Sequence, residues 1–198
     1  MSNAKSHNLV RRLVESAILI AVGTVLSELK IDMPLGGGLT VCSMLPLVFV
    51  CHRWGTRWGL FTAFVYSLLQ LLLGLNNVQY ATSALMAAGI VLLDYVVPYT
   101  LIGLSAVFNK TAMNRRVSLA VGIVFSFFLR FLCHFITGWW IWDALWPNEF
   151  GWASPIYSIL YNGAYMLPEI IITVVVALLL FASPLKKYFL GEDLKKHS

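Results

Sequence analysis

Charged side chains are scarce in this sequence of 198 residues. Only 12% of the residues are Asp, Glu, Lys or Arg, whereas 59% are hydrophobic, and ordinary soluble domains carry about twice that share of charge. A small domain folded in water still exposes much of its surface, so one core cannot hide this many apolar side chains. The mean hydropathy of +0.79 therefore excludes a water-soluble domain. It predicts an all-α integral membrane protein that forms one domain over residues 1–198.

Motifs for several other functions are also missing. The 14 Lys and Arg residues behind the net charge of +5 are too few and too scattered to follow a phosphate backbone. Cys42, Cys51 and Cys133 have neither metal-ligand spacing nor the even number of a disulfide framework. The sequence contains no nucleotide-binding loop and no His-Glu-x-x-His motif. We expect no nucleic-acid partner, no metal, no cofactor and no hydrolysis of ATP by this chain.

Six apolar stretches are candidates for transmembrane helices, each of which needs about 20 mostly apolar residues. They cover roughly 12–29, 40–52, 57–75, 81–107, 117–138 and 156–182. The second stretch is short, follows Gly36-Gly37-Gly38 and contains Pro46. It could be a tilted span or a re-entrant segment, and the latter would leave five crossings.

The positions of Lys and Arg favour six crossings. Twelve of the 14 lie before the first stretch, between the second and third, between the fourth and fifth, or after the sixth. Cytoplasmic loops attract Lys and Arg, so both termini are predicted to face the cytoplasm. The apolar run after Arg11-Arg12 is expected to be retained as the first helix, because no small-residue cleavage site follows it. Residues 1–8 are expected to be disordered or derived from a tag.

Three ionisable residues are predicted to lie near the middle of the membrane. Asp94, Arg130 and Glu169 each fall about 13 residues into their spans. Such residues are costly in lipid and are functional candidates, although buried charges are also commonly paired for structural reasons. One arginine bridging two carboxylates would be a structural network, but it would leave one negative charge, which a cationic ligand could balance. His134 lies one turn from Arg130 and shares its helix face.

Aromatic residues are concentrated near the ends of the last two spans. Five of the seven tryptophans lie in one outer connection and its approach: Trp139, Trp140, Trp142, Trp146 and Trp152. An interfacial aromatic belt explains some of them, and a lid over a flat organic cation would explain the asymmetry. Tyr157, Tyr161, Tyr165 and Glu169 recur every four residues beside Asn162. This pattern predicts a polar stripe along one side of the sixth helix.

The first helix carries small residues at helical spacing. Ala17 and Ala21 are four residues apart, with Gly23 and Ser27 nearby. Small residues let another helix approach closely. The spacing alone leaves two alternatives open, namely packing inside the bundle and contact with an external partner.

Four segments together resemble the thiamin-specific S-components of energy-coupling factor (ECF) transporters. They are Val41-Cys42-Ser43-Met44-Leu45-Pro46, Leu69-Gln70-Leu71-Leu72-Leu73-Gly74, His134-Phe135-Ile136-Thr137-Gly138 and the stretch from Tyr157 to Glu169. The last two are the most specific, and the resemblance covers most of the chain. It implies high-affinity capture of thiamin at the outer face of a bacterial plasma membrane, without chemistry on the ligand. The implied partners are a membrane coupling subunit and two ATPases, which alone would use ATP.

The resemblance also implies roles for individual residues. Asp94, next to Tyr95, would meet the aminopyrimidine or the cation, and His134 would add a polar contact. Trp142 would stack on a ring, while Tyr157 and Asn162 would hydrogen-bond the heterocycle. The docking face of the family would correspond to Ala17, Ala21 and Val25.

The sequence departs from the family at three points. Asp94 stands where the family usually has glutamate, and Val25 stands where it has a third alanine. The fifth outer loop is slightly longer, which leaves a second stacking tryptophan between Trp146 and Trp152 unassigned.

Other functions remain alternatives. Fold does not fix the ligand, so the chain could bind another vitamin or a thiamin precursor. An intramembrane hydrolase could use Glu169, His134 and Asp94, and a proton-coupled carrier could use Asp94 or Glu169 as a relay. The lack of a paired-histidine motif argues against the hydrolase, and the lack of an inverted repeat argues against the carrier.

Overall fold

The computed structural model describes residues 2–194, which are folded mainly into helices. The α-helices are α1 (Ser2–Glu28), α2 (Leu45–Trp54), α3 (Thr56–Leu73), α4 (Leu75–Val78), α5 (Ala84–Gly89), α6 (Val97–Leu101), α7 (Arg115–Thr137), α8 (Asp143–Leu145), α9 (Ser154–Ala182) and α10 (Lys186–Phe189). Two π-helices, η1 (Ile90–Val96) and η3 (Gly138–Trp142), and two 3₁₀-helices, η2 (Ile102–Lys110) and η4 (Glu192–Leu194), join them. Strands β1 (Lys30–Asp32) and β2 (Gly38–Thr40) form an antiparallel hairpin in which Ile31 lies opposite Leu39.

Among the described residues, four helical stretches are long and apolar enough to cross a membrane. They are Thr56–Leu73, Ala84–Lys110, Arg115–Leu145 and Ser154–Ala182. Large apolar side chains such as Leu85, Leu167 and Leu179 are exposed on the outside of the bundle, where lipid rather than water suits them. The chain is therefore a multi-pass membrane protein.

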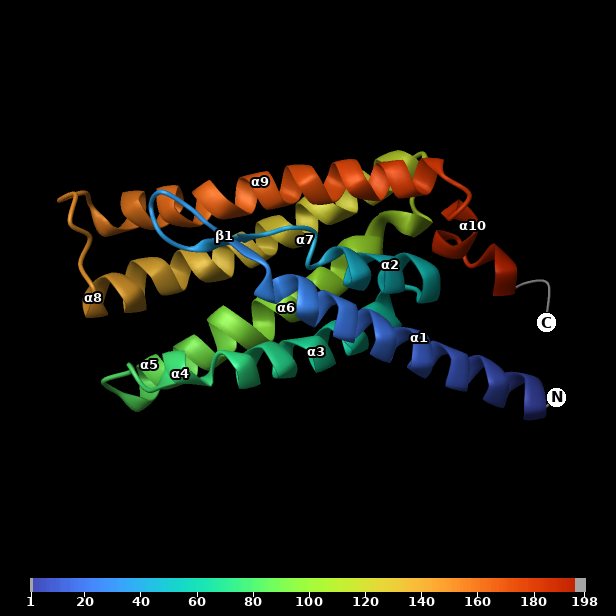
Figure 1. The fold of residues 1–198 in the computed structure, drawn as a ribbon, viewed down its shortest axis with the longest axis horizontal. Coiled ribbons are helices and arrows are strands. Elements are labelled where there is room, and N and C mark those ends of the chain that lie inside the picture. The colour runs from blue at the N-terminus through green and yellow to red at the C-terminus, as the bar shows by residue number, and fades with distance from the viewer. Residues whose placement is uncertain (1, 195–198) are drawn as a thin grey trace.

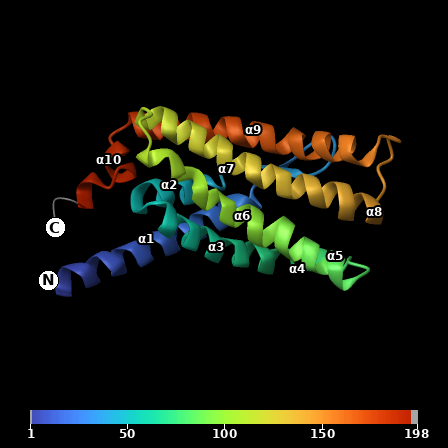
Figure 2. The same ribbon diagram turned by 180° about the vertical axis from the view of Figure 1, so that it is seen from behind.

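The long helices form an elongated bundle with distinct ends (Figure 1). Helices α7 and α9 lie side by side, and α3 packs on α6 and η2. The start of α1 lies at the same end as α10, whereas α4, α5 and α8 lie at the opposite end, as the reverse view also shows (Figure 2). The apolar core of the bundle includes Tyr66, Leu119, Ile123 and Phe127. We call the two ends the α10 end and the α8 end.

The N-terminal segment differs from the sequence-based expectation. Residues 2–8 form the first turns of α1 rather than a disordered segment, and residue 1 lies outside the described residues. No glycine or proline occurs between residues 2 and 8. Extending an existing helix costs far less than nucleating one, so the apolar helix continues into this polar segment.

The second predicted span also differs. Helix α2 has 10 residues, a length of about 15 Å, and the hairpin and a turn occupy residues 30–44 before it. Gly36 and Gly37 have positive φ angles of 93° and 76°, a conformation that glycine adopts without steric cost. Pro46 then lies in the first turn of α2, where its fixed φ suits a helix start.

The fourth predicted span, 81–107, begins at Ala84 and is irregular in its middle. Pro98 lacks a backbone N–H, and its ring would clash with the carbonyl group of Asp94 four residues earlier. The chain forms the wider turn of the π-helix η1 just before Pro98. Such π-segments are frequent at functional sites, and this one carries the buried Asp94 and Tyr95.

Candidate functional site

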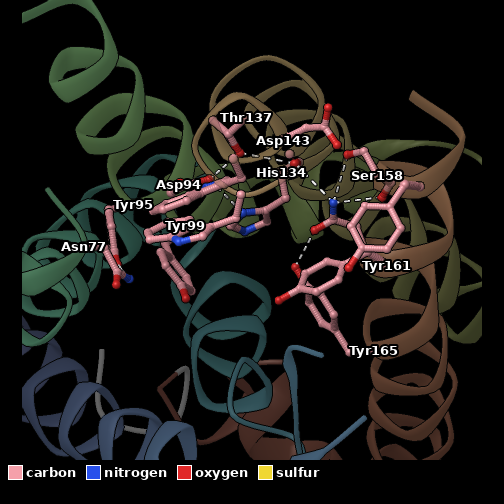
Figure 3. A pocket seen from close by; sticks show the side chains of 15 residues that line it. Asn77, Asp94, Tyr95, Tyr99, His134, Thr137, Asp143, Ser158, Tyr161 and Tyr165 are labelled. Atoms are coloured by element: carbon pink, nitrogen blue, oxygen red, sulfur yellow. Dashed lines mark hydrogen bonds and ion pairs between the residues drawn. The ribbon is translucent and has the colours of Figure 1, made fainter. Parts of the chain in front are cut away.

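A cavity of about 480 Å³ is lined by side chains from η1, α7, α8 and α9 together with shorter segments (Figure 3). We call it the aromatic cavity, because tyrosines and tryptophans make up much of its lining. It is lined by Asn77, Asp94, Tyr95, Tyr99, His134, Thr137, Gly138, Trp142, Asp143, Trp146, Tyr157, Ser158, Tyr161, Asn162 and Tyr165. The lining includes all six residues predicted to bind ligand. Its volume is within the range of small-molecule sites.

The Asp94 carboxylate is buried in the wall of this cavity and is held by indole, hydroxyl and imidazole groups. Its Oδ2 accepts a hydrogen bond from Trp142 Nε1 at 2.7 Å. Its Oδ1 accepts from Thr137 Oγ1 and lies 3.3 Å from His134 Nδ1. Within the described residues, 2–194, no lysine or arginine lines the aromatic cavity. The carboxylate group of Asp94 is therefore held in one orientation. Among the described residues, no arginine or lysine balances its negative charge.

His134 offers the cavity a second polar group. Its side chain is 13% exposed, and its Nε2 is buried with no hydrogen-bond partner among the described residues. In the neutral imidazole with its proton on Nδ1 directed at Asp94, the Nε2 atom is an acceptor. Because leaving a buried polar atom without a partner is costly, this atom indicates a place for a ligand donor.

Arg130 and Glu169 form a separate ion pair deeper in the bundle. Arg130 donates to Glu169 Oε2 at 2.9 Å, and Glu169 Oε1 accepts from Thr40 at 2.6 Å and from Ser43 at 3.2 Å. The Arg130 guanidinium also lies 5.1 Å from the Tyr99 ring centroid. The hypothesis that one arginine bridges both carboxylates is therefore wrong, because Asp94 has a different set of partners.

The predicted polar stripe on α9 lines the aromatic cavity. The ring centroids of Tyr157 and Tyr161 are 5.8 Å apart, and those of Tyr161 and Tyr165 are 6.0 Å apart. Asn162 donates to the Ser158 and His134 carbonyl groups at 2.9 Å and 3.2 Å, and its Oδ1 accepts from Tyr165 at 2.7 Å. The amide thus links α9 to α7, and Oδ1 keeps one lone pair for a ligand.

The glycine-rich turn of the hairpin covers the tyrosines. A Cβ atom on Gly36 would come within 2.9 Å of the Tyr161 ring, and one on Gly37 within 2.9 Å of the Tyr165 ring. Tyr157 donates to the Leu35 carbonyl group at 3.3 Å. Glycine therefore serves both the turn conformation and the close approach to α9.

Two of the predicted aromatic residues have structural contacts as well. The Tyr95 hydroxyl accepts from Asn77 at 2.6 Å and donates to the Gly74 carbonyl group at 3.2 Å. Trp142, besides donating to Asp94, lies nearly parallel to Trp146 with ring centroids 5.6 Å apart. Stacking of Trp142 on a ligand ring stays a prediction.

Several lining residues were not predicted. Thr137 follows His134 by three residues and could have been placed on the same helix face. Asp143 was visible only as an outer-loop acid, and Tyr99 as an aromatic residue inside an apolar span. No sequence signal connects Tyr99 with Arg130, because the contact depends on how α6 and α7 pack.

A second cavity, of about 470 Å³, adjoins the first and shares His134, Tyr161 and Tyr165 with it. We call it the polar cavity, since its lining also includes Ser27, Lys30, Thr40, Gln70 and Arg130. Among the described residues, no group of three or more His, Cys, Asp or Glu side chains could hold a metal ion.

The small-residue face of α1 points away from the bundle. Ala17, Ala21 and Val25 are exposed, whereas Ser16 and Gly23 are buried. Packing inside the bundle therefore does not explain Ala17 and Ala21.

The fold and the site define a helical membrane protein with a cavity of the size that suits a small organic molecule, lined by aromatic rings and an unbalanced carboxylate. The chain belongs to the family described as Thiamine transporter protein, whose sequence profile matches residues 13–189. It is 33% identical over 182 residues to the thiamine transporter ThiT of Bacillus subtilis (strain 168), covering 86% of this chain and 90% of that protein. Membership of this family favours transport over the hydrolase.

The fold has a counterpart among solved structures. A structure of ThiT from Listeria monocytogenes superposes with a TM-score of 0.73, at 24% identity, covering 92% of this chain and 98% of that one. The two chains therefore share their fold over nearly their whole length.

Proposed function

We propose that this protein captures thiamin at the outer face of the cell membrane, as the S-component of an ECF-type transporter, and passes it on chemically unchanged. The observation that carries the proposal is the Asp94 carboxylate, which among the described residues has no paired arginine or lysine and lies beside His134, whose Nε2 has no partner among them. Thiamin combines a permanent cation with an aminopyrimidine. A carboxylate, an acceptor nitrogen and aromatic walls suit these groups.

Each predicted residue has a task in this proposal. Asp94 binds the cation or the aminopyrimidine, and His134 Nε2 accepts a hydrogen bond from the ligand. Trp142, Tyr95 and Tyr157 provide ring faces along the aromatic cavity. Asn162 uses the remaining lone pair of Oδ1. The Arg130–Glu169 pair stabilises the surrounding helices rather than binding the ligand.

The proposal includes six crossings with both termini in the cytoplasm. The concentration of Lys and Arg in alternate connections supports this topology. The first two crossings would each combine a helix with part of the segment 29–44. A reporter fused after residue 198 tests the orientation, because a cytoplasmic C-terminus predicts activity only of a reporter that works inside the cell.

The proposed partners are a membrane coupling subunit and two ATPases, which alone use ATP. Ala17, Ala21 and Val25 on the exposed face of α1 are the proposed docking residues. Small side chains at this spacing permit close helix contact. Replacing Ala21 with Trp is expected to abolish co-purification of these partners while leaving thiamin binding by the isolated protein unchanged.

A titration of the purified protein with thiamin tests the function directly. Intrinsic tryptophan fluorescence is the readout, since Trp142 and Trp146 line the aromatic cavity. Saturable quenching by thiamin, and not by riboflavin, biotin or pyridoxine, is the expected result. A response to another vitamin would change the ligand within the same class, and no response to any of them would contradict the proposal.

A further inference from the structure

The outer connections of the sequence are acidic, and one of their carboxylates lines the site. Asp32, Asp143 and Glu149 fall in those connections, with Lys30 as the only Lys or Arg. Asp143 is the one of these acids that lines the aromatic cavity (Figure 3). The cavity therefore has two carboxylates, the buried Asp94 and the half-buried Asp143.

Asp143 differs from Asp94 in position and in partners. It begins α8, directly after Trp142, at the α8 end of the bundle. Its Oδ2 accepts from Ser154 Oγ at the start of α9, and its Oδ1 accepts from Asn148 at 3.3 Å. Both donors are neutral groups, so the Asp143 carboxylate keeps its charge, and no lysine or arginine in the described part of the chain lines the aromatic cavity.

The same contacts hold the outer loop in place. Asn148 also donates to the Trp152 carbonyl group at 2.9 Å and accepts from the Trp152 backbone N–H at 3.0 Å. The loop between α8 and α9 is thus tied to Asp143 and cannot swing across the carboxylate without breaking these bonds. Asp143 therefore presents a fixed negative charge to the aromatic cavity at the α8 end of the bundle.

We propose that Asp143 is a specificity-determining residue for ligand capture, which attracts a cation into the aromatic cavity before Asp94 binds it. The inference rests on the proposed function, because it takes a cation such as thiamin as the ligand. A charge at the entrance of a cleft raises the association rate of an oppositely charged ligand, and salt screens the effect. Asp143 thus acts on the association rate, whereas Asp94 acts on the dissociation rate.

Stopped-flow tryptophan fluorescence with thiamin separates the two rates. Asp143→Asn is expected to lower the association rate constant about threefold at an ionic strength of about 0.02 M and to have little effect at about 0.5 M. The dissociation rate constant should stay within about twofold of the wild-type value, since the deeper contacts are unchanged. An uncharged thiamin analogue, with thiophene in place of thiazolium, should associate equally fast with both proteins.

Ser154→Ala is the matched control, because it removes a donor to Asp143 and keeps the charge. It should retain the wild-type salt dependence. Equal association rates and equal salt dependence in wild type and Asp143→Asn would overturn the inference. A Ser154→Ala variant whose association rate constant falls as far as that of Asp143→Asn would also overturn it. If the wild-type protein binds thiamin normally in either case, the proposed function stands. If the wild type does not bind thiamin, both proposals fall.

Discussion

Asp94 and Glu169 are both buried carboxylates, but their surroundings are opposite. Glu169 is 1% exposed and faces Arg130 at 2.9 Å, with two hydroxyl donors on its other oxygen. Asp94 is 8% exposed, lines the aromatic cavity and accepts from hydroxyl, indole and imidazole groups. One carboxylate completes an ion pair, whereas the other lines a cavity and is the proposed partner of a cationic ligand.

The difference shows how to separate structural from functional charge in a membrane bundle. Both residues are costly to bury, so burial alone marks both as candidates. Two features separate them. Glu169 is paired with an arginine, whereas Asp94 lies beside His134, whose Nε2 has no hydrogen-bond partner among the described residues. In a buried ion pair, by contrast, the two opposite charges neutralise each other, and removing one residue leaves the other charge unpaired.

Glu169→Gln is expected to have the largest effect, on stability. The substitution leaves the Arg130 guanidinium buried without a carboxylate, which costs about 3–5 kcal/mol. The measurement is the yield of monodisperse protein and its thermal unfolding in detergent. Thr40→Val is the control, since it removes one hydroxyl donor to Glu169 and keeps the ion pair, and it should cost about 1 kcal/mol. A Glu169→Gln protein as stable as wild type would contradict the structural role.

Asp94→Asn is expected to keep the fold and lose the ligand. The amide keeps the shape of the carboxylate and removes the charge that meets the cation, a change of about 2–5 kcal/mol in binding. Thiamin affinity should therefore fall by roughly 30-fold or more, with the thermal unfolding of the unliganded protein little changed. Asp94→Glu, which keeps the charge, should retain measurable binding. Near-normal affinity of Asp94→Asn would remove Asp94 from the site.

Trp142→Phe tests how Asp94 is oriented. Phenylalanine keeps an aromatic ring but lacks the N–H that donates to Asp94 Oδ2 at 2.7 Å. Loss of one hydrogen bond to a charged group costs about 1.5 kcal/mol, so thiamin should bind roughly tenfold more weakly. Trp142→Ala should weaken binding further and reduce the fluorescence quenching. Unchanged quenching in the alanine variant would assign the fluorescence response to another tryptophan.

The sequence contains enough information to find the site but not to connect its members. Asp94 and His134 stand out because lipid penalises polar groups, and the aromatic cavity brings them together with Tyr157 and Asn162. Depth along a helix does not say which way a side chain points around the axis. For this reason the sequence left open whether Arg130 bridges both carboxylates, whereas in the structure it pairs with Glu169 and not with Asp94.

The hairpin before α2 and the π-helix η1 could not be predicted from the sequence, because they too depend on three-dimensional packing. Residues 40–52 are apolar enough to suggest a span, but the positive φ angles of Gly36 and Gly37 direct the chain into a hairpin before α2 begins. Pro98 cannot donate to the Asp94 carbonyl group, yet only the packing determines that the result is a π-helix carrying Asp94. Local propensity cannot specify such outcomes, because tertiary contacts decide among the available geometries.

A third carboxylate, Asp193, extends the comparison to a partly exposed site at the α10 end and should give the smallest effect. Arg53 donates to both of its oxygens at 2.8 Å, and Arg11 donates to Oδ2 at 2.5 Å. The bonds from Arg53 are the main cause that lowers the pKa of Asp193 to about 2. A lowered pKa adds stability that is present above the ordinary value of 3.8 and is lost as the pH falls toward 2.

Asp193→Asn should therefore destabilise the protein by about 1 kcal/mol at pH 7, a value reduced by solvent screening. The difference from wild type should shrink as the pH falls below about 4 and vanish only below pH 2, where the wild-type carboxyl group is protonated in the folded protein as well. Thermal unfolding across this pH range is the measurement, with Glu192→Gln as a control for removing a neighbouring acid. A stability difference that stays constant with pH would show that Asp193 contributes through packing rather than through its charge. In that case this carboxylate, unlike Glu169, would not depend on its arginine partners.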